Sequence, residues 1–312
     1  MKAAIIGAGL IGRSWANVFA RAGWNVRVWD PEPRQRSAAA RLVEESLHEL
    51  AVHGLVTEPA AAARRVSVVE SMPEAVADAE YVQECGPEVL EVKRSTFEEL
   101  DAAAPAATIL ASSTSAIVAS KFTGHLAGRA RCIVAHPVNP PHLVPVVELC
   151  GAPWTSDDTK RRAREILEAV GQVPIAVKRE IDGFILNRLQ VALLTEAFRL
   201  VQEGYVSPED LDHTVSDGLG LRWAFMGPFE TIELNAPGGI PDYCRRYTPW
   251  FRRYMEDLPP ATVWDDAQWQ RVADAWGRTP SPGKIAAKSV WRDRRLAALV
   301  AHKRAQEPSD PD

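Results

Sequence analysis

The sequence of 312 residues predicts an α/β fold: a Rossmann-like, doubly wound, mostly parallel sheet followed by an all-α C-terminal domain. In the first half of the chain, short apolar segments alternate with amphipathic ones, which is the pattern of parallel strands joined by helices. After Ile181 the strand-like segments stop, whereas helical periodicity continues. We therefore expect two domains, a sheet domain of residues 1–180 and a helical domain of residues 181–312.

The strands of the first domain are expected where short runs are rich in apolar and β-branched residues. These runs are residues 3–6, 25–29, 66–69, 81–84, 108–112, 132–135, 144–149 and 173–177. Helix starts are indicated by Ser71, Ser156 and Ser207, each followed within three positions by acidic residues. The second domain has helical patterns at 183–203, at 207–218 and in tryptophan-rich segments to 305. Such an aromatic surplus is more typical of a core or a subunit interface than of a cofactor site.

A glycine pattern, Gly7-x-Gly9-x-x-Gly12, lies between the first strand and a segment expected to be a helix from Ser14 to Ala22, the context that indicates a dinucleotide site. Gly7 permits a tight turn, Gly9 lets the backbone approach a pyrophosphate, and Gly12 lets the helix pack close to the strand. Asp30 ends the second strand, at the offset of an acid that binds the ribose hydroxyls and repels a 2′-phosphate. We therefore expect NAD rather than NADP, although two arginines just downstream could weaken this preference. The alternative is a chance glycine turn in a non-binding domain.

His136 follows a buried strand-like run and so lies at the carboxyl end of a strand, where open α/β sheets place their chemistry. Glu148 lies within a second apolar run, where a carboxylate is costly unless it is paired. If the carboxylate fixes one ring nitrogen of His136, the other nitrogen can accept or return a proton near neutral pH. The pair predicts a general acid/base dyad. The alternative is a polar pair that only closes a strand turn.

Composition excludes several classes of partner. The formal charge of −5 and the lack of a basic run argue against nucleic acid and against membrane surfaces. No apolar run approaches the roughly 20 residues of a membrane helix, and the first strand leaves no room for a signal peptide. The four cysteines have no metal-ligand spacing. We expect no metal, and a reducing, cytoplasmic location.

Six motifs together resemble the 3-hydroxyacyl-CoA dehydrogenase superfamily. They are the glycine pattern, Gln83-Glu84-Cys85-Gly86-Pro87-Glu88, Ser112-Ser113-Thr114-Ser115, His136-Pro137-Val138-Asn139-Pro140-Pro141, Gly183-Phe184-Ile185-Leu186-Asn187-Arg188-Leu189, and Gly218-Leu219-Gly220-Leu221-Arg222-Trp223-Ala224-Phe225-Met226-Gly227-Pro228. The resemblance covers roughly residues 1 to 250. Within the superfamily the chain is most similar to the λ-crystallin branch, which implies L-gulonate 3-dehydrogenase activity and a homodimer.

The resemblance also implies roles for individual residues. His136 would be the acid/base and Glu148 its orienting partner, while Ser115 and Asn187 would hydrogen-bond the reacting oxygen or a bound water. Asn139 would hold the nicotinamide side, and the remaining NAD contacts would be Leu10, Ile11, Asp30, Glu88 and Lys93. Alternatively, Ser115 is a helix cap before Ile117, Asn187 is an amide on a helix face, and Glu88 and Lys93 form a surface pair.

The chain departs from the acyl-CoA enzymes, whose corresponding segment is lysine-rich and binds the phosphates of CoA. Here residues 31–70 contain no lysine and balance arginines against glutamates, so this segment is poorly suited to a polyphosphate. A small hydroxy acid is the better substrate. The enzyme would transfer a hydride from the carbon bearing a 3-hydroxyl to NAD. Alternatives are an L-carnitine dehydrogenase, a 3-hydroxyacyl-CoA dehydrogenase, or a non-catalytic NAD(H)-binding structural protein in the manner of a lens crystallin.

Arg222 is the candidate substrate anchor. It lies between glycines and large apolar residues, where a plain surface residue would usually cost less. A guanidinium can bind a carboxylate through two parallel hydrogen bonds, so Arg222 could hold the C1 carboxylate and place the 3-hydroxyl against His136. Alternatively it pairs with Glu230 or Glu233 to brace the helical domain. Trp223 and Phe225 could form the pocket wall, or could surround a quaternary ammonium if carnitine is the substrate.

Overall fold

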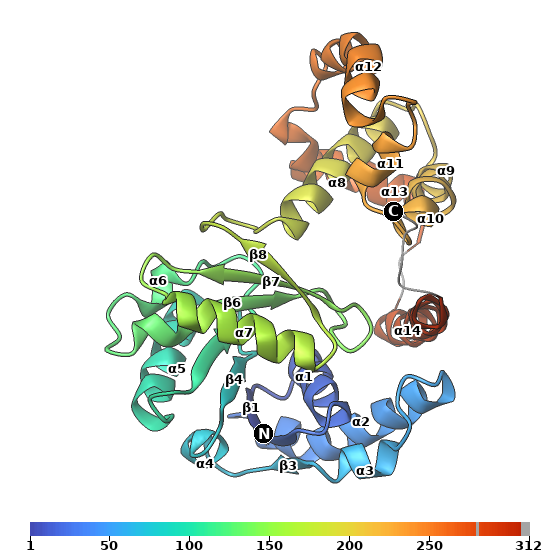
Figure 1. Cartoon of the computed structure of the whole chain (residues 1–312). Coiled ribbons are helices and arrows are strands. Elements are labelled where there is room, and N and C mark those ends of the chain that lie inside the picture. Colours follow the sequence, from blue (N-terminus) through green and yellow to red (C-terminus); the bar gives the residue numbers. More distant parts are fainter. Residues whose placement is uncertain (279–280, 307–312) are drawn as a thin grey trace. The chain divides into compact units, whose positions relative to one another are not determined.

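The computed structural model describes residues 1–278 and 281–306 (Figure 1). The chain divides into two compact units. One consists of Met1–Asn187 with the described residues from Gly283 onward, and we call it the sheet unit. The other is Arg188–Pro282, which we call the helical unit. Each unit is described by itself.

The sheet unit has eight strands in the order β3-β2-β1-β4-β5-β6-β7-β8. All neighbouring strands are parallel except β6 and β7, so the predicted doubly wound, mostly parallel sheet is confirmed. The strands are β1 (Lys2–Ile6), β2 (Asn25–Trp29), β3 (Val66–Val68), β4 (Tyr81–Glu84), β5 (Ile109–Ser112), β6 (Cys132–Pro137), β7 (Val146–Gly151) and β8 (Val173–Val177).

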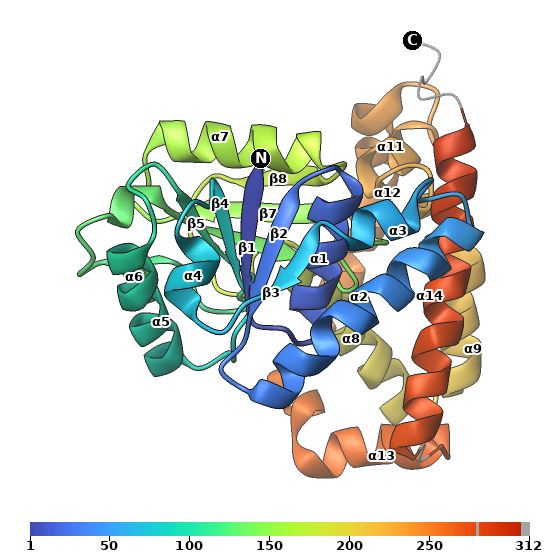
Figure 2. The same ribbon diagram turned by 90° about the horizontal axis from the view of Figure 1, so that it is seen from below.

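Helices cover both faces of the sheet because successive strand residues point to opposite sides. On one face, Ile5 packs with side chains of α1 (Leu10–Arg21), α2 (Pro33–Val52) and α7 (Asp157–Ala169). On the other, Ile6 packs with α4 (Met72–Val76), α5 (Leu90–Ala103) and α6 (Ser120–Thr123) (Figure 2). The shorter α3 (Pro59–Ala63) and the 3-10 turn η1 (Arg129–Arg131) complete the connections.

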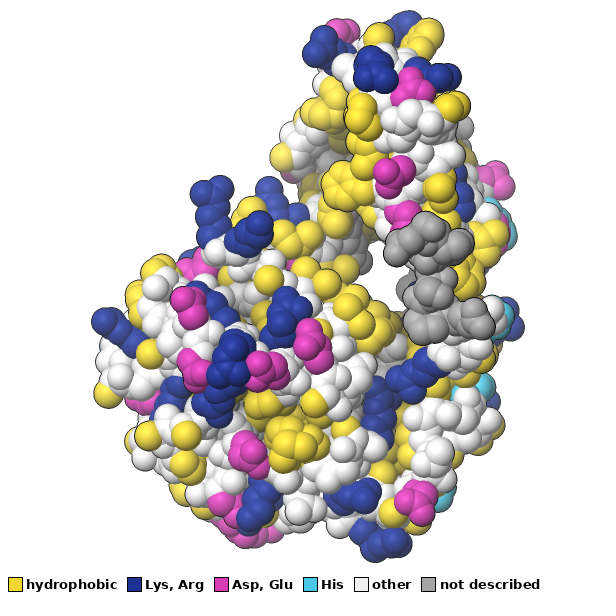
Figure 3. Space-filling model, in the orientation of Figure 1, with side chains coloured by type: hydrophobic (Ala, Val, Ile, Leu, Met, Phe, Trp, Pro, Cys, Tyr) yellow, Lys and Arg dark blue, Asp and Glu magenta, His cyan; other side chains and the backbone are white. Residues whose placement is uncertain are grey.

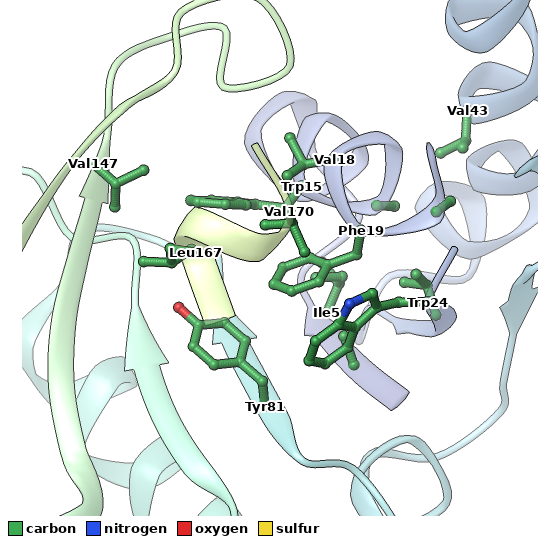
Figure 4. Close-up of a cluster of buried hydrophobic side chains, with 14 of the residues drawn as sticks. Ile5, Trp15, Val18, Phe19, Trp24, Val43, Tyr81, Val147, Leu167 and Val170 are labelled. Atoms are coloured by element: carbon green, nitrogen blue, oxygen red, sulfur yellow. The ribbon is translucent and has the colours of Figure 1, made fainter. Parts of the chain in front are cut away.

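Aromatic side chains fill the first of these cores. Figure 4 shows Trp15 and Phe19 of α1 gathered with Trp24 and Tyr81 beside Ile5. The ring centroid of Phe19 lies 5.2 Å from that of Trp24 and 5.3 Å from that of Tyr81. Offset and edge contacts of this kind stabilise beyond the area they bury. They fix α1, and with it the glycine turn at the helix start, against β1 and β4.

The last described helix, α14 (Pro282–Ala305), groups with the sheet rather than with the other C-terminal helices. The prediction placed all of residues 181–312 in one helical domain, but α14 groups with the sheet unit. Its residues Leu296, Ala297 and Val300 pack against the core that includes α2, and Arg294 forms an ion pair with Glu49 of α2 at 2.7 Å. Sequence periodicity identifies the helix but does not say which core its apolar face covers.

The helical unit contains helices and turns only among its described residues, as the sequence predicted. They are α8 (Leu186–Gln202), α9 (Pro208–His213), the π-helical turn η2 (Thr214–Leu219), α10 (Gly220–Trp223), α11 (Pro228–Glu233), α12 (Gly239–Met255), η3 (Ala261–Trp264) and α13 (Asp266–Trp276). Figure 3 shows hydrophobic side chains gathered on the surface of this unit. In the part of the chain that the structure describes, no helix has the length and hydropathy needed to cross a membrane.

Candidate active site

His136 and Glu148 face each other across the antiparallel pair β6 and β7, where they occupy paired register positions. Nδ1 of His136 lies 2.8 Å from Oε2 of Glu148, and the two residues are 5% and 2% exposed. The predicted pairing is therefore confirmed, and it is made inside the protein. Because the sheet is parallel from β3 to β6, the end of β6 that carries His136 lies at the same edge as the carboxyl ends of β1, β4 and β5.

Glu148 is held as an anion by the start of α8. Its Oε1 accepts hydrogen bonds from the backbone N–H groups of Ile185 and Leu186, at 2.7 and 2.9 Å. Burial alone would raise the pKa of Glu148, but the hydrogen bonds from His136 and these two N–H groups outweigh burial and lower the pKa. An ionised Glu148 favours the tautomer of His136 with the proton on Nδ1. Nε2 then remains as the proton acceptor.

Phe184 is a site residue that the sequence reasoning did not single out. It is fully buried, and its ring centroid lies 5.5 Å from that of His136. Its φ of 49° is in the left-handed region, which a non-glycine residue rarely adopts, and Gly183 before it has a φ of 77°. This turn directs the following N–H groups toward Glu148. The signal in the sequence was the family motif itself, because helical periodicity does not reveal a left-handed phenylalanine.

Ser115, Asn187 and Glu88 are brought together by hydrogen bonds. Nδ2 of Asn187 donates to the carbonyl oxygen of Ser115 at 2.9 Å, and the N–H of Ser115 donates to Oε2 of Glu88 at 3.0 Å. The hydroxyl of Thr114 also donates to Glu88. Ser115 is not the cap before Ile117, because that N–H donates to Oγ1 of Thr114 at 2.9 Å. Burial would raise the pKa of Glu88, but the bonds from Thr114 and Ser115 lower it.

The structure corrects the expectations for Lys93. Neither a surface pair with Glu88 nor a contact of its ammonium with the cofactor fits, because Lys93 is 1% exposed. Its Nζ lies 3.2 and 3.1 Å from the two carboxylate oxygens of Glu84, at the end of β4. Glu84 is also 1% exposed, so the two residues form a fully buried ion pair. Burial of this kind is set by the tertiary fold and has no signal in the motif.

The glycine turn has the shape that a dinucleotide requires. Gly7 has a φ of 107°, and a Cβ there would lie 2.7 Å from the carbonyl oxygen of Cys85. A Cβ at Gly12 would lie 1.8 Å from the carbonyl oxygen of Gly7, so the helix packs directly on the turn. Nothing lies within 4 Å of a Cβ at Gly9, which leaves its backbone open to approach. The first N–H groups of α1, at Leu10 and the partly exposed Ile11, face this opening without a side-chain cap.

Asp30 is fixed beside this turn. Its Oδ2 accepts from the N–H of Ala8 at 2.6 Å and its Oδ1 from the N–H of Glu32 at 2.8 Å. Each carboxylate oxygen retains a second acceptor position, which suits a pair of ribose hydroxyls. These residues therefore fit an adenosine diphosphate portion of NAD. Asn139 is exposed in the turn after β6, three residues beyond His136 in the chain.

Arg222 belongs to α10 of the helical unit, and its side chain is exposed. The alternative role for Arg222 was an ion pair that braces the helical domain. Among the described residues, Arg222 forms no ion pair with Glu230 or Glu233. All four cysteines are free. Within residues 1–278 and 281–306, no group of three or more His, Cys, Asp or Glu side chains is placed to hold a metal ion.

Backbone donors at the start of α1 and a buried acid–base pair at the same edge of the sheet are what an NAD-dependent oxidoreductase requires, and fold and site place the protein in this class. The chain belongs to the 3-hydroxyacyl-CoA dehydrogenase family. The family's NAD-binding domain matches residues 2–181, and its C-terminal domain matches residues 183–271.

Individual relatives extend this result. Lambda-crystallin of Oryctolagus cuniculus is 42% identical over 309 residues, or 97% of each chain. An L-carnitine dehydrogenase of Streptomyces coelicolor is 38% identical over 263 residues, or 82% of each chain. A solved structure of 5-formyl-3-hydroxy-2-methylpyridine 4-carboxylic acid 5-dehydrogenase, an NAD+-dependent dismutase, has a TM-score of 0.83 at 27% identity, with 98% of this chain and 99% of that chain covered.

Proposed function

We propose that the protein oxidises the 3-hydroxyl of a small hydroxy acid, with L-gulonate as the preferred substrate. The observation that carries this proposal is the buried 2.8 Å pair of His136 and Glu148 at the carboxyl end of β6, in a fold with a dinucleotide turn. NAD, when bound, supplies the acceptor for the hydride. The protein's own groups then have two tasks, to orient the hydroxyl and to remove its proton.

His136 removes the hydroxyl proton through Nε2. Glu148 holds the ring by Nδ1 and stabilises the imidazolium that forms, because the N–H groups of Ile185 and Leu186 maintain the ionised state of its carboxylate. Phe184 limits rotation of the ring and excludes water from its inner face. Ser115 and Asn187 orient the reacting oxygen in this proposal. The hydrogen bond from Nδ2 of Asn187 to the carbonyl oxygen of Ser115 supports this role, because it brings the two residues together.

The charge distribution supports a small acid over an acyl-CoA thioester. Residues 31–70 include α2, the helix that follows β2. They contain arginines and glutamates but no lysine. Two of these arginines are already paired, Arg36 with Glu70 and Arg41 with Glu45. They are not arranged to bind a polyphosphate. The 42% identity to lambda-crystallin over nearly the whole chain supports L-gulonate.

L-Carnitine is the second candidate substrate, supported by a specific observation. The carboxylate anchor that we propose, Arg222, is followed by Trp223 and Phe225, which are 41% and 58% exposed. Aromatic faces next to a carboxylate anchor suit a zwitterion with a quaternary ammonium. The 38% identity to an L-carnitine dehydrogenase supports the same candidate.

We also propose a homodimer in a reducing, cytoplasmic compartment. Only four described residues of the helical unit are buried, namely Ala197, Thr231, Ala236 and Val263. Large side chains such as Trp250 and Phe229 are 54% and 72% exposed. Apolar exposure on this scale is typical of a protein interface. The free thiols of the buried Cys132 and Cys150 support the compartment.

Substrate-dependent NAD reduction by the wild type and by His136→Ala tests the function. We expect turnover with L-gulonate, a lower or absent rate with L-carnitine and with a 3-hydroxyacyl-CoA thioester, and a loss of about 10²- to 10⁴-fold in His136→Ala. The affinity for NADH should stay nearly unchanged in this variant. Retention of more than about half of the wild-type rate would exclude His136 as the acid/base. A higher rate with L-carnitine would leave the proposed role of His136 and Glu148 unchanged and would make L-carnitine, not L-gulonate, the substrate.

A further inference from the structure

Behind the turns that carry Glu88 and Ser115, the ion pair of Glu84 and Lys93 is fully buried. Each residue is 1% exposed, and Lys93 donates to both carboxylate oxygens. Taking two charges out of water is costly, and a buried pair is often no more stabilising than apolar residues of the same size. Stability is therefore a weak explanation for this pair, and its contacts indicate another.

The Glu84 carboxylate connects the ends of two neighbouring strands. Its Oε1 accepts from the N–H of Gly86 at 2.6 Å, in the turn after β4. Its Oε2 accepts from the hydroxyl of Ser112, the last residue of β5, and Oγ of Ser112 accepts from the N–H of Thr114 at 3.2 Å. A Cβ at Gly86 would lie 2.9 Å from Oε1, so the turn follows the carboxylate closely.

Both turns carry residues of the proposed site. The turn after β5 presents Thr114 and Ser115, and both donate to Glu88 in the turn after β4. The turn after β4 also lies against the dinucleotide turn, because the carbonyl oxygen of Cys85 would lie only 2.7 Å from a Cβ at Gly7. A shift of Glu84 would therefore move the turns after β4 and β5, and the turn after β4 is in contact with the dinucleotide turn.

We propose that Glu84, neutralised by Lys93, is a positioning residue that sets the geometry of the turns at residues 85–88 and 113–115. Lys93 acts through Glu84 and does not touch the ligand. The roles of Glu88 and Ser115 in this inference rest on the proposed function. The link from Glu84 to the dinucleotide turn rests only on the observed contacts.

Two double variants separate positioning from stability. Glu84→Gln/Lys93→Met removes both charges but keeps an amide that can accept from Gly86 and exchange a hydrogen bond with Ser112. Glu84→Met/Lys93→Met removes both charges and all of these acceptors. Neither variant leaves a buried unpaired charge, so a difference between them reports on the hydrogen bonds. The readouts are the Kd for NADH from fluorescence titration, the melting temperature, and kcat/KM.

We expect the Met/Met variant to raise the Kd for NADH by about 10-fold or more, and the Gln/Met variant to stay within about 3-fold of the wild type. Equal losses in both variants would overturn the proposal, because they would show that the hydrogen bonds retained by the Gln/Met variant do not set the NADH affinity. Wild-type affinity in both would also overturn it, because the pair would then only stabilise the fold. Since NADH affinity does not depend on the hydroxy acid, failure of the proposed substrate leaves this test intact.

A second, partly buried ion pair provides the matched control. Arg131 and Asp101 lie 2.9 Å apart and are 12% and 11% exposed, at the opposite end of the strands, where β6 begins. Arg131→Met/Asp101→Asn should lower the melting temperature without changing the Kd for NADH. If the Met/Met variant does not fold, Ser112→Ala removes one link without touching a charge. Ser112→Ala should raise the Kd for NADH by a smaller factor than the Met/Met variant is expected to. An unchanged Kd would contradict the proposal.

Discussion

Asp30 is the residue on which cofactor choice depends, because the backbone N–H groups of Ala8 and Glu32 hold its carboxylate beside the dinucleotide turn. A 2′-phosphate would bring negative charge against this carboxylate, whereas a ribose diol can donate to it. We expect a wide preference for NAD over NADP. Asp30→Ser should raise the KM for NAD by about 10- to 100-fold, the range for a hydrogen bond to a charged group, and should narrow the preference.

The measurement is kcat/KM with each cofactor for the wild type, Asp30→Ser and Asp30→Asn. The asparagine variant is the matched control, because it keeps an acceptor for Ala8 and removes only the charge. It should retain more of the NAD affinity than the serine variant while gaining use of NADP. Similar kcat/KM values with the two cofactors in the wild type would show that Asp30 does not discriminate.

At the scale of single residues, the sequence predicted which side chains pair better than it predicted how deeply a side chain is buried or which backbone conformation it adopts. The partner of His136 followed from its place at a strand end and from the cost of an unpaired Glu148, and the 2.8 Å contact confirms the pair. The catalytic role of the pair stays a prediction. The burial of Lys93 and the left-handed φ of Phe184 could not be predicted, because both depend on how distant segments pack.

At the scale of elements, existence and order were predictable and ends were not. All eight predicted strands are present, because each is a short apolar run. The first helix was expected from Ser14 but begins at Leu10, since its start is set by the backbone at Gly9. The helix expected from Gly183 begins at Leu186, because Gly183 and Phe184 have positive φ. The starts of these two helices carry residues of the candidate site. The backbone that is hardest to predict from the sequence therefore lies in the part of the molecule that we assign to function.

The packing of α14 also makes a testable difference to pH dependence. His142, between β6 and β7, accepts from Arg21 through its carbonyl oxygen at 2.7 Å, and its Nδ1 is buried with no hydrogen-bond partner among the described residues. Burial, then the nearby charges of Arg21 in α1 and Arg292 in α14, lower the pKa of His142 to about 4. The folded protein thus keeps this imidazole neutral at pH values where the unfolded chain, with a pKa near 6.5, is protonated.

Between pH 6.5 and 4 the unfolded state therefore binds more protons at His142, so this residue makes stability fall as the pH falls. The contribution is up to about 1.4 kcal/mol per pH unit. We expect His142→Gln to flatten the dependence of the unfolding free energy on pH in this window, measured by urea denaturation. The exposed His48 of α2 provides the control. His48→Gln should show the same dependence of the unfolding free energy on pH as the wild type. Parallel curves for the wild type and His142→Gln would refute the effect.

At the scale of the whole molecule, the two units differ in how they are stabilised. The sheet unit has a continuous core on each face of its sheet. The helical unit leaves aromatic side chains exposed that the sequence predicted for a core or an interface, including Trp250, Trp264 and Trp269. Such a unit needs a further surface to cover it, and the proposed homodimer would supply one. The composition indicated that these aromatic residues have a packing partner, but it could not identify the partner.

The last prediction concerns Arg222, the candidate substrate anchor, which belongs to the helical unit. Arg222 is exposed, and in the described ranges it forms none of the ion pairs expected of a brace. If it binds the C1 carboxylate, Arg222→Met should raise the KM for L-gulonate or L-carnitine by about 10- to 100-fold, since a bidentate charged contact is lost. The KM for a 3-hydroxyacyl-CoA thioester, which has no free carboxylate at C1, should not change. Steady-state kinetics on the three substrates, with the melting temperature of each protein, measures this.

Arg246→Met is the matched control, because Arg246 is an exposed arginine of the same unit that already pairs with Asp242 at 2.9 Å. A lower melting temperature of Arg222→Met with an unchanged KM would instead assign Arg222 a structural role in the helical unit.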